Sequence, residues 1–112
     1  MEDRLSKKNR YSSLVLIYGN LLTKVTLRRM KSFYLEDLSL SEIAQNDKVS
    51  RNAVFVSLLN GEKELDDYEK KLSLLEKEKT VSELMDEAED CDDISKIKDL
   101  LHRMKGEISH GI

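Results

Sequence analysis

The sequence predicts an all-α protein, and three of its features indicate that class. It holds no proline and only four glycines in 112 residues, so little interrupts a helix. Apolar residues recur three and four positions apart among charged residues, which make up 37% of the chain. Pairs of the capping-box type, in which a hydroxyl residue precedes a glutamate by three positions, begin at Ser39 and Thr80. A chain of this length is expected to form one domain.

Two helices are predicted before residue 39. The first covers residues 9–22 and the second covers residues 27–35, with a break at residues 23–26 between them. Helical spacing places a set of apolar residues toward a common core: Leu14, Ile17, Tyr18, Leu21, Met30, Phe33 and Tyr34.

Residues 39–60, SLSEIAQNDKVSRNAVFVSLLN, have the spacing of a helix-turn-helix. Ser39 and Glu42 cap a short first helix, and Ser50 caps the second. Two helices that cross steeply need a small residue at the crossing and a branched apolar residue opposite, which Ala44 and Val54 supply. An ordinary helical hairpin is the alternative.

Lys48 occupies the turn of this motif, where glycine is usual because the backbone there is left-handed. A residue with a side chain at such a position costs on the order of 1 kcal/mol. The turn is therefore expected to form, at some cost in stability.

A helix stop or a hinge is predicted at Asn60 and Gly61, because glycine adopts the left-handed cap without strain. It divides the chain into residues 1–61, the N-terminal helices with the helix-turn-helix, and residues 62–112, a C-terminal helical extension. Two apolar seams are predicted in this part of the chain. One begins before the extension, at Leu58, and continues through Leu65, Tyr68, Leu72 and Leu75, and the other lies in a last helix, through Ile94, Ile97, Leu101, Met104 and Ile108. These amphipathic helices are expected to fold back as a helical layer against each other and to pack on the first part, as one folding unit, or to pair with a second subunit as a homodimer.

Charge is distributed unevenly along the chain, whose net charge is −3. Residues 1–34 carry eight Lys or Arg against two acids, whereas residues 61–112 carry nine against sixteen. A basic N-terminal part and an acidic C-terminal part steer anionic partners toward the N-terminal part. The single cysteine, Cys91, and the absence of an apolar run of about 20 residues predict a cytoplasmic protein that does not insert into a membrane.

Two sets of residues are candidates for binding nucleic acid. Ser50, Arg51 and Asn52 begin the second motif helix, where Arg suits guanine, Asn suits adenine and Ser suits a phosphate. The second set lies in the basic N-terminal part, which also holds Tyr11 as a possible stacking residue: Arg28, Arg29 and Lys31, with Lys24 and the arm residues Arg4, Lys7, Lys8 and Arg10. For the four arm charges, a solvated and partly disordered terminus is the favoured interpretation.

Phe55, Val56 and Leu59 are apolar on the motif-helix face that would meet a DNA groove. Arg51 is the only cation between Ser50 and Asn60, although affinity for duplex DNA rests on several phosphate contacts. Such an apolar patch is typical of a protein contact surface. These three residues are therefore the predicted partner-binding site.

No catalytic, metal or cofactor site is predicted. The sequence lacks a phosphate loop, an HExxH pair and a nucleophile elbow. Cys91 and His102 are isolated, and the acidic run at residues 86–93 lacks the spacing of a calcium loop. The expectation is a protein that is not an enzyme.

Four segments in order resemble the YlxM-type family of small bacterial helix-turn-helix proteins: LLT at residues 21–23, SLSEIA at 39–44, VSRNAV at 49–54 and LDDYEKKL at 65–72. The resemblance implies an all-helical protein whose motif is similar to sigma-factor region four. It also implies a regulatory role in the signal recognition particle pathway of co-translational targeting, beside whose components the family is encoded. The partner would then be the signal recognition particle protein or its RNA complex.

The chain departs from that family at two places. The usual Phe-Gly before VSR is replaced by Asp47 and Lys48, and an apolar stretch from Val56 follows the motif's aromatic residue where the family is polar or basic. Fewer cations weaken phosphate contacts and more apolar surface favours a protein partner. A DNA-binding transcriptional regulator is the alternative function, and a dimeric scaffold is the third.

Overall fold

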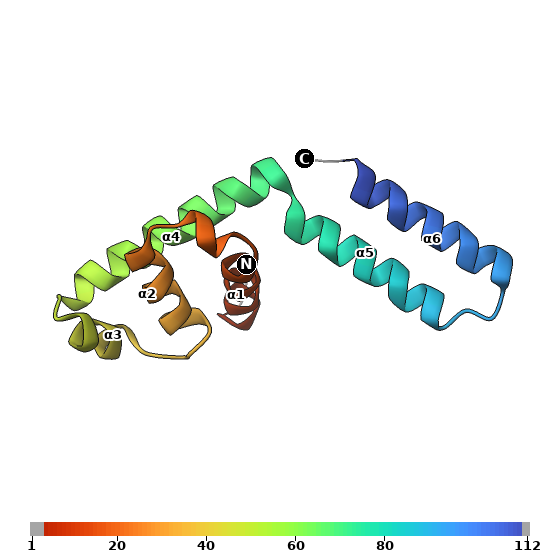
Figure 1. The fold of residues 1–112 in the computed structure, drawn as a ribbon. Coiled ribbons are helices and arrows are strands. Elements are labelled where there is room, and N and C mark those ends of the chain that lie inside the picture. The colour runs from red at the N-terminus through yellow and green to blue at the C-terminus, as the bar shows by residue number, and fades with distance from the viewer. Residues whose placement is uncertain (1–3, 111–112) are drawn as a thin grey trace. The chain divides into compact units, whose positions relative to one another are not determined.

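The computed structural model describes residues 4–110. Within that range the chain is helical and holds no strand (Figure 1), which confirms the all-α prediction. The elements are α1 (Arg4–Tyr18), the short 3-10 helix η1 (Gly19–Leu21), α2 (Lys24–Tyr34), α3 (Leu40–Asp47), α4 (Arg51–Leu72), α5 (Leu74–Glu89) and α6 (Ile94–Ser109). None of these helices is both long and apolar enough to span a bilayer.

The chain divides into two compact units, Met1–Lys70 and Lys71–Ile112. This boundary lies nine residues beyond the division expected at residue 61, and α4 continues unbroken through Gly61 to Leu72. The helix stop predicted at Asn60 and Gly61 is therefore wrong. Whether residues 62–112 pack on the first part or on a second subunit stays a prediction, and residues 1–3 and 111–112 of the two expected parts lie outside the described range.

Gly61 serves helix packing instead of helix termination. A Cβ atom at this position would lie 2.9 Å from the Sδ atom of Met30 and 3.0 Å from the Cγ2 atom of Thr26, both on α2. Because glycine has no Cβ, the backbone of α4 can approach α2 this closely. Gly61, which resembled a helix end in the sequence, therefore lies at a close contact between two helices.

The helix-turn-helix prediction is confirmed in its local chemistry. The Oγ atom of Ser39 accepts from the amide of Glu42 at 3.1 Å, and the Glu42 carboxylate accepts from the amide of Ser39 at 3.1 Å. These hydrogen bonds from Ser39 lower the pKa of Glu42. The Oγ atom of Ser50 accepts from the amide of Ala53 at 3.0 Å, which caps α4 as expected. Ala44 and Val54, which were predicted at the crossing of the two helices, are buried, and so are Ile43 and Leu58.

Lys48 adopts the left-handed conformation that the sequence predicted, with φ 57° and ψ 44°, at the end of α3. We expect Lys48→Gly to raise the free energy of unfolding by about 1 kcal/mol, because glycine removes the clash of Cβ with the backbone. Urea denaturation followed by tyrosine fluorescence measures this change. Lys48→Ala is the control, since it removes the charge and keeps the strain; equal stabilisation by both variants would contradict the explanation.

Tyrosine hydroxyls connect α1 and α2 to one side of α4. Three buried tyrosines each donate to a carboxylate there: Tyr34 to Glu62, Tyr11 to Asp66 at 2.7 Å and Tyr18 to Glu69 at 2.8 Å. Burial, and then the hydrogen bond to the carboxylate, raises the pKa of Tyr11 and of Tyr34, so both remain donors. Tyr11 is therefore a core residue and does not offer its ring to an unpaired base.

Some details of the N-terminal helices differ from the prediction. The basic arm is not disordered, because α1 already begins at Arg4. α2 begins at Lys24, three residues earlier than expected, since the Oγ1 atom of Thr23 accepts from the amide of Thr26 at 3.3 Å and caps the helix. Leu21, which was assigned to the core, is exposed because it lies in η1.

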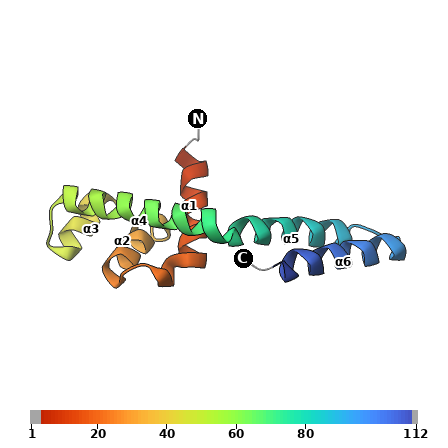
Figure 2. The same ribbon diagram turned by 90° about the horizontal axis from the view of Figure 1, so that it is seen from above.

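The second unit is a hairpin of α5 and α6, which run side by side in opposite directions in both views (Figures 1 and 2). The capping-box pattern predicted that a helix starts at Thr80, and this prediction is wrong. Its Oγ1 atom donates to the carbonyl of Glu76 at 3.0 Å, inside a continuous α5. The core of the hairpin is small: Leu84, Leu100 and Met104, with Val81 and Ala88 packed against them. Ile94, Leu101 and Ile108 of the predicted α6 seam are exposed.

Candidate partner-binding surface

The outer face of α4 exposes three neighbouring apolar side chains. Phe55, Val56 and Leu59 are 46%, 45% and 45% exposed, and Phe55 and Leu59 stand one turn apart. The structure thus leaves accessible the residues that the sequence named as a partner-binding site. We call these three residues the α4 apolar surface.

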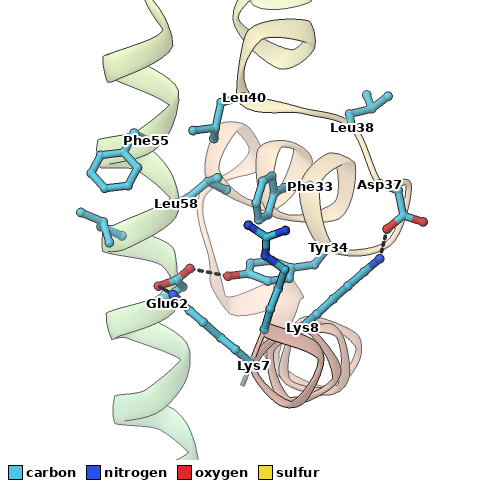
Figure 3. Close-up of a pocket in the computed structure, with 12 residues that line it drawn as sticks. Lys7, Lys8, Phe33, Tyr34, Asp37, Leu38, Leu40, Phe55, Leu58 and Glu62 are labelled. Carbon is cyan, nitrogen blue, oxygen red and sulfur yellow. Dashed lines mark hydrogen bonds and ion pairs between the residues drawn. The ribbon is translucent and has the colours of Figure 1, made fainter. Parts of the chain in front are cut away.

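Two residues of the α4 apolar surface, Phe55 and Leu59, also line an open groove of about 440 Å³ in the first unit (Figure 3). Its walls come from α1, the end of α2, the loop to α3, and α4. The apolar lining residues are Phe33, Leu38, Leu40, Phe55, Leu58 and Leu59, and the charged ones are Arg4, Lys7, Lys8, Asp37 and Glu62. The groove therefore has an apolar floor with charges along one side.

The charged side of the groove is held by contacts between elements. Glu62 on α4 accepts from the Tyr34 hydroxyl, and its other oxygen lies 3.8 Å from the Nζ atom of Lys7 on α1. Lys8 donates to the carboxylate of Asp37 in the loop after α2. Figure 3 shows both lysines reaching from α1 toward these carboxylates. The first turns of α1, interpreted from the sequence as a solvated arm, form a wall of the groove.

Arg51 and Asn52 are exposed in the first turn of α4, directly after the capping residue Ser50. Together with Leu40 and Phe55 they line a second, shallow recess. The structure thus brings together the predicted base-reading residues and the α4 apolar surface, because Phe55 and Leu40 belong to both hollows. One face of the helix-turn-helix carries both candidate sites.

Arg28 and Arg29 on α2 have a different role, because both bind Asp47 at the end of α3. The Nη2 atom of Arg28 lies 2.9 Å from one carboxylate oxygen, and the Nε atom of Arg29 lies 2.7 Å from the other. These hydrogen bonds, that of Arg29 most of all, lower the pKa of Asp47. The two arginines hold α3 against α2, and Lys31 is exposed on α2. Nucleic-acid binding by Arg28, Arg29 and Lys31 stays a prediction.

The Asp47 contacts predict a pH dependence of stability. Because the folded pKa of Asp47 lies below its unfolded value, its stabilisation is present above the unfolded pKa and is lost as the pH falls through the folded one. We expect Asp47→Asn to cost about 1 kcal/mol at neutral pH, a size typical of partly exposed ion pairs. Urea midpoints of the two proteins should converge in acid. A constant difference between them at every pH would contradict this assignment.

No three His, Cys, Asp or Glu side chains gather so as to hold a metal ion among residues 4–110. The sequence interpretation missed the groove itself, because its residues come from positions as distant as Lys7 and Glu62. The carboxylates at 62, 66 and 69 are spaced four and three apart, which places them on a single side of a helix, but of these three only Glu62 lines the groove. The groove and the motif helix define a helix-turn-helix protein with an apolar outer surface.

Comparison with known proteins gives the family. Residues 5–105 match the model of the UPF0122 family, described as "Putative helix-turn-helix protein, YlxM / p13 like". The chain belongs to this family, as its resemblance in four segments indicated. The family is described by its motif and not by a catalytic activity.

Relatives in several bacteria carry the same family name. The chain is 42% identical to a UPF0122 protein of Geobacillus sp. (strain WCH70) over 86 residues, which span 77% of this chain and 78% of the relative. It is 39% identical to one of Halalkalibacterium halodurans over 89 residues, 80% of this chain and 82% of the relative. A UPF0122 protein of Malacoplasma penetrans is 45% identical over 64 residues, 57% of this chain and 60% of that relative.

Proposed function

We propose that this helix-turn-helix protein is a cytoplasmic, non-enzymatic accessory protein that binds and regulates the signal recognition particle machinery. The observation that carries the proposal is the exposure of Phe55, Val56 and Leu59 on the outer face of α4. The resemblance to the YlxM-type family supplies the pathway. The partner is the signal recognition particle protein, alone or in its complex with RNA.

The chemistry of the α4 apolar surface favours a protein partner over duplex DNA. A helix that enters the major groove meets an anionic backbone, and its affinity depends on several cations. Arg51 is the single cation among residues 50–60, which comprise the cap and the first ten residues of the motif helix. Protein interfaces, in contrast, have apolar centres rich in aromatic residues with charged rims. Phe55 beside the groove, with Lys7 and Lys8 along its edge, matches that composition.

A titration of the full chain against three ligands in one buffer tests this function. The ligands are the targeting GTPase, its complex with the targeting RNA, and random duplex DNA. We expect saturable binding to the GTPase or its complex, and none to the DNA at physiological salt. Binding to DNA alone would overturn the proposal.

A DNA-binding transcriptional regulator is the second candidate function, and one observation favours it. Arg51 and Asn52 are exposed side by side at the start of α4, where the recognition helix of such motifs contacts base edges. This function predicts salt-sensitive, sequence-dependent binding that Arg51→Ala weakens by about 1 to 3 kcal/mol. Anisotropy titrations at low salt measure it. Binding of equal strength by the wild type and Arg51→Ala would exclude this role for the arginine.

A further inference from the structure

The C-terminal hairpin leaves part of the apolar side of α6 uncovered. Leu100 and Met104 are buried against α5, whereas Ile94, Leu101 and Ile108 are 69%, 51% and 71% exposed. These three exposed residues are seven positions apart, so they lie in one row along the helix. We call Ile94, Leu101 and Ile108 the α6 row.

The hairpin is too small to be stable through its own core. Its unit spans Lys71–Ile112, and its buried apolar cluster is Leu84, Leu100 and Met104 with two partly buried neighbours. Domains of about 40 residues depend on disulfides, metals or oligomerisation. Cys91 is a free thiol, and the described residues offer no metal site. Covering the α6 row with a further helix would supply the missing apolar burial.

The charges around the α6 row indicate what covers it. Lys98 and Lys105 stand one turn from the row residues and are exposed, so lysines edge the row. The whole of α6 carries four Lys or Arg against two acids, a net charge of +2. The complementary surface is therefore an acidic helix that also exposes an apolar side chain.

Helix α5 has that chemistry. It carries six carboxylates against two lysines, a net charge of −4, and Met85 is half exposed on it. Within one copy α5 covers Leu100 and Met104, so it does not reach the α6 row. A second copy supplies both an acidic α5 for the basic α6 and a basic α6 for the acidic α5. This reciprocity is what a two-fold interface requires.

We infer that the α6 row is the contact surface of a homodimer, in which α6 of one copy packs against α5 of the other to form a four-helix bundle. Each α6 row then loses its contact with water, and Lys98 and Lys105 face carboxylates of the partner. The inference does not depend on the proposed function, since it concerns the other compact unit of the chain.

Sedimentation equilibrium of the full chain tests this interface. At low micromolar concentration we expect twice the 13.0 kDa mass of the chain. Leu101→Glu should raise the dissociation constant at least about 100-fold, because each of the two symmetric contacts loses a buried leucine. Leu16→Glu, the same substitution at an exposed leucine of α1, should leave the dissociation constant unchanged. Association should also weaken as salt rises.

Ile108→Glu provides a second variant near the end of α6, for use if circular dichroism shows that Leu101→Glu unfolds the hairpin. A wild-type chain that stays monomeric throughout the micromolar range would overturn the inference. A dimer that neither α6 variant weakens would overturn it as well, as would one that Leu16→Glu weakens equally.

Discussion

Gly61→Val is expected to lower the free energy of unfolding of the first unit by about 2 to 3 kcal/mol. The smallest added atom, a Cβ, would lie 2.9 Å from the Sδ atom of Met30, which is completely buried. Valine adds two further methyl groups at the same contact. The helices α2 and α4 must then separate, or Met30 must leave its rotamer, and either change loses packing.

Urea denaturation followed by tyrosine fluorescence isolates this effect. All four tyrosines, Tyr11, Tyr18, Tyr34 and Tyr68, precede residue 71, so their signal reports on the first unit. Gly106→Val is the matched control, because no atom lies within 4 Å of a Cβ built at Gly106 on α6. It should leave the tyrosine transition in place. If Gly61→Val left the midpoint unchanged, the close contact between α2 and α4 would be incorrect.

Leu59→Asp is expected to weaken binding to the signal recognition particle protein by at least about 2 kcal/mol, or roughly 30-fold. A carboxylate at the centre of an apolar interface must lose its water without gaining a partner. Since Leu59 is half exposed in the free protein, the variant should keep its fold. Isothermal titration calorimetry against the targeting GTPase or its RNA complex measures the change.

Leu16→Asp is the matched control for that experiment, because Leu16 is an exposed leucine on α1 that does not line the groove. Phe55→Ala should weaken binding to a similar degree, as buried aromatic residues dominate protein interfaces. Equal affinities for the wild type and Leu59→Asp would place the partner elsewhere on the molecule.

The sequence was sufficient to predict local features that depend only on residues a few positions apart. The capping pair Ser39 and Glu42, the left-handed Lys48 and the cap at Ser50 are each determined by neighbours in the chain, and all three are present. The exposure of Phe55 followed from the helical period once Val54 was placed at the crossing of the two helices. These features were enough to place the candidate surface.

The features that sequence did not predict depend on partners distant in the chain. Gly61 resembles a helix end until Met30 on α2 is known to lie against it. The pattern beginning at Thr80 fits a helix start as well as a helix interior, where its hydroxyl bonds the carbonyl of Glu76. The groove joins Lys7 to Glu62 across 55 positions, a pairing that no local period contains.

The sequence also could not predict which side of α6 is buried. The predicted seam of α6 is covered only in part: Met104 is buried against α5 together with Leu100, whereas Ile94, Leu101 and Ile108 are exposed. A periodic pattern gives the apolar arc of a helix, but the position of the partner helix decides which part of that arc is covered. The uncovered part is the α6 row.

Photo-crosslinking from position 55 tests most directly whether the outer face of α4 binds protein. A photoreactive amino acid would replace Phe55 in one sample and Leu16 in a control, each mixed with the targeting GTPase, its RNA complex and duplex DNA together. We predict a covalent product with the protein component from position 55 and none from position 16. A product from position 55 with the DNA alone would contradict the central claim.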